Sequence, residues 1–106
     1  MDDGAHGACN RLGRVFDLLG KRWTGLVLGA LMEGPARFSE LARTIDGVSE
    51  RMLTERLNEL AEAGLVERHV LPGPPVGVEY QLTERGKALG PALDALAEWA
   101  EDHLAD

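Results

Sequence analysis

The first hydrophobic positions in the chain have helical spacing. They are Leu12, Val15, Phe16 and Leu19. These positions predict a helix over residues 11–19 that ends at Gly20, because hydrophobic side chains three and four residues apart share one helix face. Residues 1–8 are small and acidic without such a period, and we expect a flexible arm there. Residues 23–32 are apolar almost all round, which favours a buried central helix.

Two glycines, Gly25 and Gly29, share one face of this second helix. In a membrane this spacing is typical of helix dimers, but the segment is short. We therefore expect the glycines to let another element of a soluble core approach closely. The Gly34-Pro35 pair then ends the helix, since proline cannot continue one.

The next two hydrophobic groups predict a pair of short helices. The first group is Phe38, Leu41, Ala42 and Ile45, with Ser39 as a cap, and the second is Leu53, Leu57, Leu60 and Ala61, with Ser49 as a cap. A turn of three residues, 46–48, separates them, and Gly64 is expected to end the second helix in the left-handed conformation. Two helices joined by such a glycine-containing turn are typical of the helix-turn-helix motif.

Two strands are predicted after Gly64. Residues 65–71 have strand-like composition, and residues 78–82 alternate between apolar and polar side chains. Residues 72–75 read Pro-Gly-Pro-Pro and must form the tip of a hairpin, because prolines cannot join a ladder of backbone hydrogen bonds.

A long last helix is expected to follow Thr83, which can cap it, and Gly90-Pro91 is expected to kink or break it. Its apolar positions cover more than one narrow stripe. They are Leu89, Leu93, Leu96, Ala97, Trp99, Ala100 and Leu104. A core this small can hardly absorb so much apolar surface, so the excess indicates a partner subunit.

The order of these elements predicts an α+β, mostly helical fold, a winged helix-turn-helix with an extra helix at each end. Residues 9–106 would form a single winged helix domain, which a chain of 106 residues is long enough to support. The common use of this arrangement is duplex DNA binding, with the second helix of the pair in the major groove.

The polar face of that second helix has the side chains needed to read bases. Its members are Arg51, Thr54, Glu55 and Asn58. Arginine can bind guanine at two acceptors, asparagine can do the same for adenine, threonine can touch a thymine methyl, and glutamate can accept from cytosine. The alternative is a solvated face, which any surface helix must have. Arg51 could likewise pair with Glu55 one turn away.

Further candidates for phosphate contact flank this face. Arg37 and Arg43 border the preceding helix, and each is also an ordinary surface residue. Arg56 lies near the edge of the leucine stripe, so it either reaches a phosphate or packs its stem over the core. Ser49 is first a helix cap and only second a phosphate contact through its backbone N–H.

Charge is divided unevenly along the chain. The net charge of −7 at pH 7 by itself argues against a nucleic-acid partner. Residues 1–56, however, hold 8 Lys and Arg against 8 Asp and Glu, whereas residues 57–106 hold 3 against 10. The first half can therefore offer a basic face while the second half stays acidic.

Several classes of function find no support in the sequence. It has no glycine-rich phosphate loop and no nucleophile elbow, and its three histidines are too scattered for a metal site, so no enzyme, metal or cofactor is expected. The longest apolar stretch, residues 26–32, is too short to span a membrane, and the expected location is the cytoplasm. The single cysteine, Cys9, excludes an internal disulfide.

The sequence also resembles the HxlR-type transcriptional regulators, small bacterial winged helix proteins related to the MarR group, over residues 9–101. Besides Cys9, the strings that carry the resemblance are LLGKRWTGLVLGAL (18–31), GPARFSEL (34–41), SERMLTERLNELAEAGLVER (49–68) and VEYQLTERGKAL (78–89). The resemblance implies a DNA-binding dimer that regulates transcription in response to a small molecule or a redox signal. It also implies that the helix starting at Ser49 is the recognition helix.

By the same resemblance, dimer contacts come from the first and last helices. The candidate interface residues are Leu12, Phe16, Leu93, Leu96, Trp99 and Ala100. Cys9 becomes a candidate oxidant sensor, with Arg11 and Arg14 close by and a helix expected to begin just after it. The alternative for Cys9 is a small buried residue at the dimer seam. Trp23 and Trp99 are candidates for lining a ligand pocket, the alternative being core or interface.

The wing departs from the family pattern. Family wings often place a lysine or arginine just before the Val-Glu-Tyr string, and here that position is Gly77. Either Arg68 and His69, at the base of the wing, take over phosphate contact, or the hairpin serves mainly to brace the recognition helix.

We therefore predict a homodimeric, sequence-specific DNA-binding transcriptional regulator that binds double-stranded DNA at a pseudo-palindromic operator and responds to a redox or small-molecule signal. Repression is the simplest mode, because a bound dimer blocks polymerase by occupancy. The alternative is a winged helix that contacts another protein through its acidic second half and uncharged wing tip, without specific DNA binding.

Overall fold

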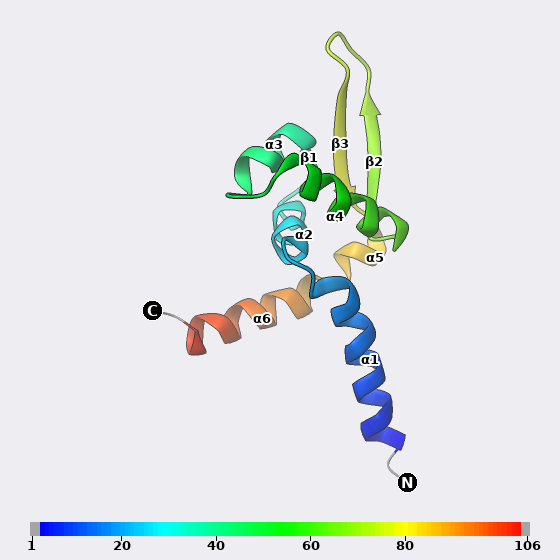
Figure 1. The fold of residues 1–106 in the computed structure, drawn as a ribbon, viewed down its shortest axis with the longest axis vertical. Coiled ribbons are helices and arrows are strands. Elements are labelled where there is room, and N and C mark those ends of the chain that lie inside the picture. Colours follow the sequence, from blue (N-terminus) through cyan, green and yellow to red (C-terminus); the bar gives the residue numbers. More distant parts are fainter. Residues whose placement is uncertain (1–2, 105–106) are drawn as a thin grey trace.

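The computed structural model describes the backbone of residues 3–104 and, from Cys9 onward, their side chains. The elements follow in the order α1 (Asp3–Leu19), α2 (Thr24–Met32), β1 (Ala36–Arg37), α3 (Phe38–Thr44), α4 (Glu50–Glu62), β2 (Val66–Leu71), β3 (Gly77–Leu82), α5 (Glu84–Lys87) and α6 (Gly90–His103) (Figure 1). The predicted α+β winged helix-turn-helix is confirmed, with α3 and α4 as the helix pair and the β2–β3 hairpin as the wing.

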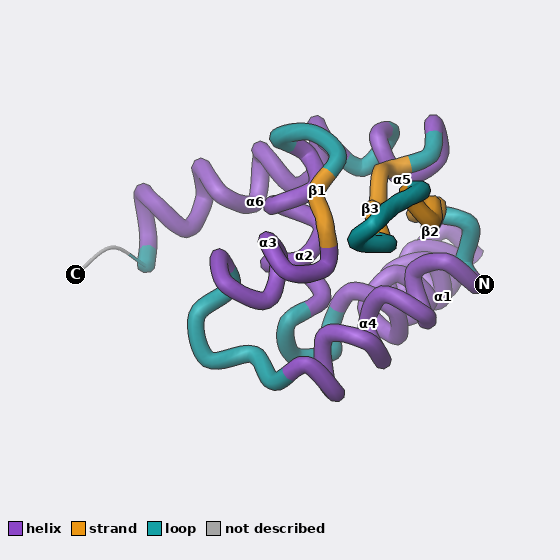
Figure 2. The backbone as a smooth tube through the Cα atoms, turned by 90° about the horizontal axis from the view of Figure 1, so that it is seen from above, coloured by secondary structure: helices purple, strands orange, loops and turns teal. Residues whose placement is uncertain are grey.

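The core is built where α2, α3 and α4 meet the three-stranded sheet (Figure 2). Its buried side chains are Val27, Leu28, Leu31, Leu41, Ile45, Leu53, Leu57, Leu60, Leu65, Val66, Tyr80 and Leu82. The leucines predicted as the α4 stripe are all fully buried, whereas Ala61, predicted with them, is exposed. Burial of this one face holds α4 against the core and leaves the opposite face outward.

Capping residues set the ends of α4 and α5 as predicted. The Ser49 hydroxyl accepts a hydrogen bond from the Met52 N–H at 3.0 Å, and the Thr83 hydroxyl accepts one from the Gly86 N–H at 3.1 Å. Gly64 follows α4 with φ +80°, the left-handed conformation that a Cβ would disfavour. The capping role predicted for Ser39 is wrong. The cap of α3 is Arg37, because β1 runs straight into this helix.

The sheet has three antiparallel strands in the order β1-β3-β2. In the wing, Val66 lies opposite Leu82 and Leu71 opposite Gly77, so residues 72–76 form the tip. The third strand, β1, places Ala36 opposite Tyr80 and was not predicted. Two residues are too few to show the alternation of a strand, so only the pairing with β3 reveals it.

The predicted interruption of the last helix is confirmed. Helix α5 ends at Lys87 and α6 begins at Gly90, with Pro91 in the first turn of α6, where its missing N–H costs no helical hydrogen bond. Helix α6 then leaves the winged part of the molecule in one direction while α1 leaves it in another (Figure 1).

Helix α1 is longer than predicted. It begins at Asp3 rather than near Arg11, so the expected arm of residues 1–8 is helical from Asp3 onward, while Met1 and Asp2 lie outside the described residues. Ala5 and Ala8 favour helix whereas Gly4 and Gly7 disfavour it, so local preference alone does not explain this extension.

Helix α2 is buried on only one face, formed by Thr24, Val27, Leu28 and Leu31. The close approach predicted at Gly25 and Gly29 is wrong for a single protomer. Within the described residues, apart from the adjacent residues and the backbone of α2 itself, no atom lies within 4 Å of where a Cβ would stand at either glycine. Leu26, between them, is 59% exposed. This side of α2 is therefore open.

Candidate nucleic-acid interface

The outer face of α4 carries the predicted base-reading side chains. Arg51, Thr54, Glu55 and Asn58 are all exposed, on the side of α4 opposite its buried leucines. No part of the described chain covers this face. The helix therefore presents a polar surface of the kind that direct readout in a major groove requires.

A groove lies between this helix, the start of α3 and the wing. It is lined by Arg37, Phe38, Ser39, Thr54, Asn58, Arg68, Pro75, Val76, Gly77, Val78 and Tyr80. Two of the base-reading candidates, Thr54 and Asn58, thus share one concave surface with two of the phosphate candidates, Arg37 and Arg68. The groove brings together residues that are distant in sequence, which is what a continuous nucleic-acid contact needs.

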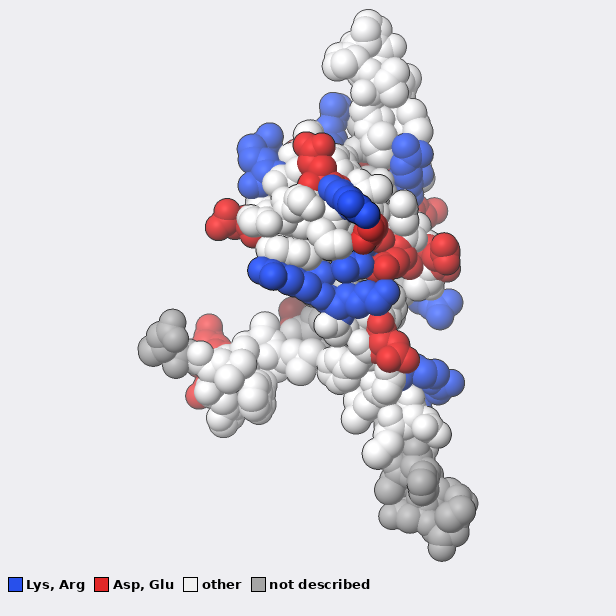
Figure 3. All heavy atoms as spheres, in the orientation of Figure 1, with Lys and Arg blue, Asp and Glu red and all other residues white. Residues whose placement is uncertain are grey.

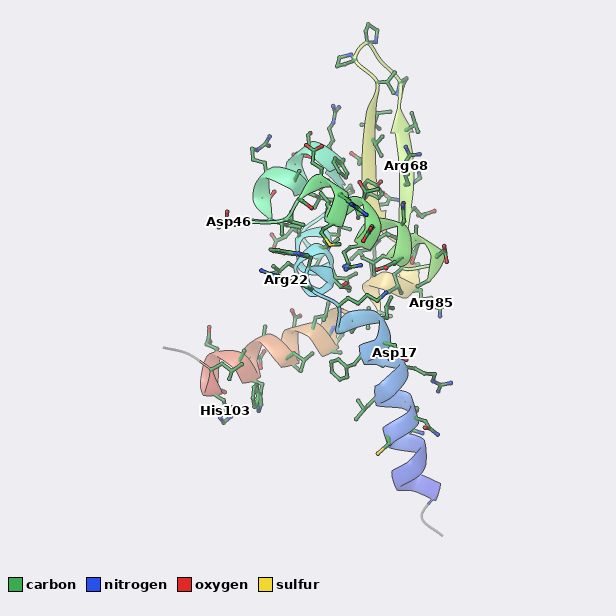
Figure 4. All side chains as sticks on the ribbon, viewed as in Figure 1. Asp17, Arg22, Asp46, Arg68, Arg85 and His103 are labelled. Atoms are coloured by element: carbon green, nitrogen blue, oxygen red, sulfur yellow. The ribbon has the colours of Figure 1, made fainter. Side chains whose placement is uncertain are left out.

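The two groove arginines come from the sheet. Arg68 on β2 lies opposite Tyr80, at the base of the wing (Figure 4). Arg37 on β1 lies opposite Glu79. Within the described part of the chain, neither arginine has a carboxylate within ion-pair distance, so both charges are free for a phosphate. His69, predicted beside Arg68, is opposite Glu79 and is not among the residues that line the groove.

Arg51 makes the predicted contact with Glu55 and remains open to solvent. Its Nε lies 3.7 Å from Oε1 of Glu55, one turn along α4. The Arg51 side chain is nevertheless 89% exposed, and a long ion pair in full contact with water contributes little. Exchanging this contact for a base or a phosphate would therefore cost little.

Arg56 does not lie on the open face, contrary to its predicted phosphate contact. Its side chain is only 12% exposed, its Nε donates to the Arg22 carbonyl at 2.9 Å, and its Nη1 pairs with Glu59 at 2.9 Å. Glu59 also accepts from Lys21 Nζ at 3.0 Å. These contacts join α4 to the segment between α1 and α2. Of the two alternatives for Arg56, packing over the core therefore fits its position, and its role is structural.

Stability at low pH should depend on Glu59. The hydrogen bond from Lys21, followed by contacts with Arg56, holds the pKa of Glu59 below its ordinary value of 4.5 against the opposing effect of burial. A pKa lowered by folding stabilises the protein above about pH 4.5, and this contribution is lost as the pH falls through the folded-state pKa. Glu59→Gln should therefore lower the urea midpoint at pH 7, but only slightly, since solvent screens the contact. Between pH 7 and pH 3, the urea midpoint of Glu59→Gln should fall less than that of the wild type.

Glu62→Gln is the matched control, because Glu62 is exposed on the same helix and outside this cluster. If the midpoints of wild type and Glu59→Gln declined in parallel with acid, the ion cluster would have no part in stability.

The distribution of charge agrees with a localised interface. Lys and Arg side chains lie over the winged part of the molecule between Asp and Glu side chains, and the tip of the wing is uncharged (Figure 3). The net acidity of the chain is therefore compatible with a cationic groove.

Cys9 is exposed on α1. The expectation that a helix begins just after it is wrong: six residues of α1 precede Cys9, so Cys9 lies within the helix and not at its start. Arg11 and Arg14 are exposed on the following turns. The alternative of a buried Cys9 does not hold within one protomer.

The aromatic candidates lie in different surroundings. Trp23 packs against the core, with the Arg22 guanidinium 4.6 Å from its ring centroid, and it adopts φ +80° at the start of α2. Trp99 on α6 is 53% exposed and lies 5.0 Å from the ring of His103. Trp23 is therefore part of the packing beneath the helix-turn-helix, while Trp99 stands on an open helix face.

The predicted dimer residues lie on surfaces that one protomer leaves uncovered. Leu12, Phe16, Leu96 and Trp99 are each more than half exposed, and Leu93 and Ala100 are half-buried. Among the residues described, no three His, Cys, Asp or Glu side chains are grouped as metal ligands. No helix in the described ranges has the length and apolar character needed to cross a bilayer.

Sequence reasoning missed the lining that the wing and β1 contribute to the groove, namely Gly77, Val78 and Tyr80 beside Arg37. It also missed the cluster around Glu59, although the spacing of Arg56 and Glu59 by three residues on a helix was a usable signal.

Comparison with known proteins agrees with this architecture. The HxlR-like helix-turn-helix family model matches residues 18–106. The HTH-type transcriptional regulator YodB of Bacillus subtilis is 48% identical over 93 residues, which cover 88% of this chain and 83% of the relative. The solved reduced form of YodB is 46% identical, with a TM-score of 0.79 over 91% of this chain and 96% of that one. The redox regulator HypR in its oxidized form is 35% identical, with a TM-score of 0.83 over 91% and 98%. The chain belongs to the HxlR-like helix-turn-helix family.

Proposed function

We propose that this protein is a sequence-specific DNA-binding transcriptional regulator that inserts α4 into the major groove. The observation that carries the proposal is the open polar face of α4 beside a groove with two free arginines. Arg51, Thr54 and Asn58 would contact base edges, and Arg37 and Arg68 the phosphates on either side. Ser49 caps the start of α4, where its backbone N–H would contact a phosphate. Its relatives named as transcriptional regulators support the same function.

The regulator would act as a homodimer in the cytoplasm. Apolar side chains are exposed along α1 and α6. One face of α2 is also exposed. A second copy of the chain would cover such surfaces and give a two-fold symmetric molecule. Its two α4 helices would then meet successive major grooves about 34 Å apart on a pseudo-palindromic operator. Occupancy of that operator would repress transcription by excluding polymerase.

The regulator would respond to a redox or small-molecule signal. YodB has been solved in reduced form and HypR is named a redox regulator, and the exposure of Cys9 supports a similar response here. With one cysteine in the chain, a disulfide would join two protomers or one protomer and a small thiol.

Selection of bound fragments from a random pool of duplexes tests the function directly. We expect enrichment of one site with two related halves, and weaker enrichment without reductant for the wild type than for Cys9→Ser. Equal and feeble binding to every duplex would contradict the proposal and favour a protein-contact module. Equal enrichment with and without reductant would contradict the role of Cys9 alone.

Arg51→Ala should lower affinity for the selected duplex by about 1–3 kcal/mol, because it removes a bidentate base contact. Fluorescence anisotropy at several salt concentrations measures the effect, since affinity without a stated salt concentration is uninterpretable. Arg85→Ala is the control, because Arg85 is exposed on α5, away from the groove (Figure 4). This substitution removes the same charge as Arg51→Ala. Unchanged affinity in Arg51→Ala would remove the base contact from the proposal.

A further inference from the structure

Arg37 stands at the junction between the sheet and the helix-turn-helix. It is the last residue of β1 and the cap of α3, and its backbone N–H donates to Oε1 of Glu40 at 2.8 Å. Across β3 its partner is Glu79. Pairing on one side and capping on the other fix the Cα of Arg37, so only its side chain is free to choose a direction.

That side chain extends along β3 toward the wing. A Cβ built on Gly77 would stand 3.3 Å from Nη1 and 3.7 Å from Cζ of Arg37. The guanidinium therefore occupies space that a side chain at the first residue of β3 would take. Residues 72–77 carry no charge of their own, and within the described chain Arg37 has no carboxylate at ion-pair distance.

We propose that Arg37 acts as the cation of the wing, and that Gly77 is the residue that makes room for it. The positive charge that the hairpin lacks is supplied from β1, the strand next to β3, at the wing end of the groove. There it would bind a backbone phosphate beside the base pairs read by α4. This inference rests on the proposed function, and it identifies Arg37 as the residue that makes the phosphate contact of the wing.

The placement has a consequence for specificity. A guanidinium held against the hairpin contacts the sugar-phosphate backbone and no base edge, so it positions the protein without reading sequence. Loss of its charge should weaken binding by a similar factor on every duplex. Each phosphate contact contributes about one to the slope of log affinity against log salt.

The test compares salt titrations of Arg37→Gln and Arg85→Gln with those of the wild type. Glutamine keeps the backbone cap and much of the stem of Arg37, and thermal melting by circular dichroism verifies the fold. We expect Arg37→Gln to reduce the slope by about one per protomer bound, and Arg85→Gln to leave it unchanged. Equal changes in the two variants would mean a bulk charge effect and would overturn the inference.

A charge-transfer variant makes the test specific to the wing. Gly77→Lys in the Arg37→Gln background returns a cation to the same place from the hairpin itself, and it should restore most of the lost slope. No restoration by this folded double variant would overturn the shared site. A wild type that prefers no duplex would overturn the proposed function itself. If the wild type binds its selected duplex and Arg37→Gln has the same salt slope as the wild type, only the role of Arg37 would be overturned.

Discussion

Leu57→Ala is expected to lower the free energy of unfolding by about 2–5 kcal/mol, the usual range for truncating a fully buried leucine. Leu57 is completely buried on α4, in the middle of its core-facing stripe. The substitution removes apolar contact and leaves a cavity beneath the helix that carries Arg51 and Asn58. Because small domains are stable by only about 5–15 kcal/mol, the loss is a large part of the total.

Urea denaturation at one fixed protein concentration measures this effect, since association would add to apparent stability. Glu62→Ala is the control, because Glu62 is exposed on the last turn of the same helix. We expect it to change the free energy of unfolding by no more than about 0.5 kcal/mol. A loss below about 1 kcal/mol in Leu57→Ala would mean that α4 is not held by its buried stripe.

Trp99→Ala is expected to weaken the proposed dimer by about 2–4 kcal/mol, or roughly 30- to 1,000-fold in dissociation constant, the range of an aromatic hot spot. Trp99 is 53% exposed on α6, Leu96 on the same helix is 51% exposed, and Phe16 on α1 is 52% exposed. Large exposed apolar side chains on two helices indicate surfaces that a partner covers.

Sedimentation velocity over a range of concentrations measures the dissociation constant. The matched control is Val76→Ala, which truncates a side chain that is 70% exposed on the wing tip, away from α1 and α6. Trp99→Ala should keep the melting signature of a folded monomer, because Trp99 is not part of the core. A wild type that is monomeric throughout, or an unchanged dissociation constant in Trp99→Ala, would contradict the dimer.

The parts of the fold that sequence reasoning predicted are those decided by local chemistry. Ser49 and Thr83 cap helices wherever their hydroxyls reach a free N–H, and Gly64 ends α4 because it tolerates a positive φ. The polar face of α4 was equally visible, because side chains three and four residues apart must share one side of a helix.

The candidate site was predictable only where its residues are close together in the sequence. Arg51, Thr54 and Asn58 lie on one helix, so their common face follows from spacing alone. Arg37 and Arg68 join them only because β1 and β2 flank β3, and β1 pairs with residues of β3 that lie about forty positions further along the chain. A two-residue strand carries no periodic signal, so neither β1 nor the wing end of the groove could be anticipated.

By itself, the sequence determined which segments are helices, where most of them end and which side of α4 faces outward, since these depend on neighbours within a turn or two. Tertiary structure alone decided that Arg56 is held by the Arg22 carbonyl, that Gly25 and Gly29 face open space, and that Arg37 reaches Gly77. These outcomes depend on which distant backbones come within a few ångströms of each other. Such distances are properties of the packed chain, and no local pattern of residues contains them.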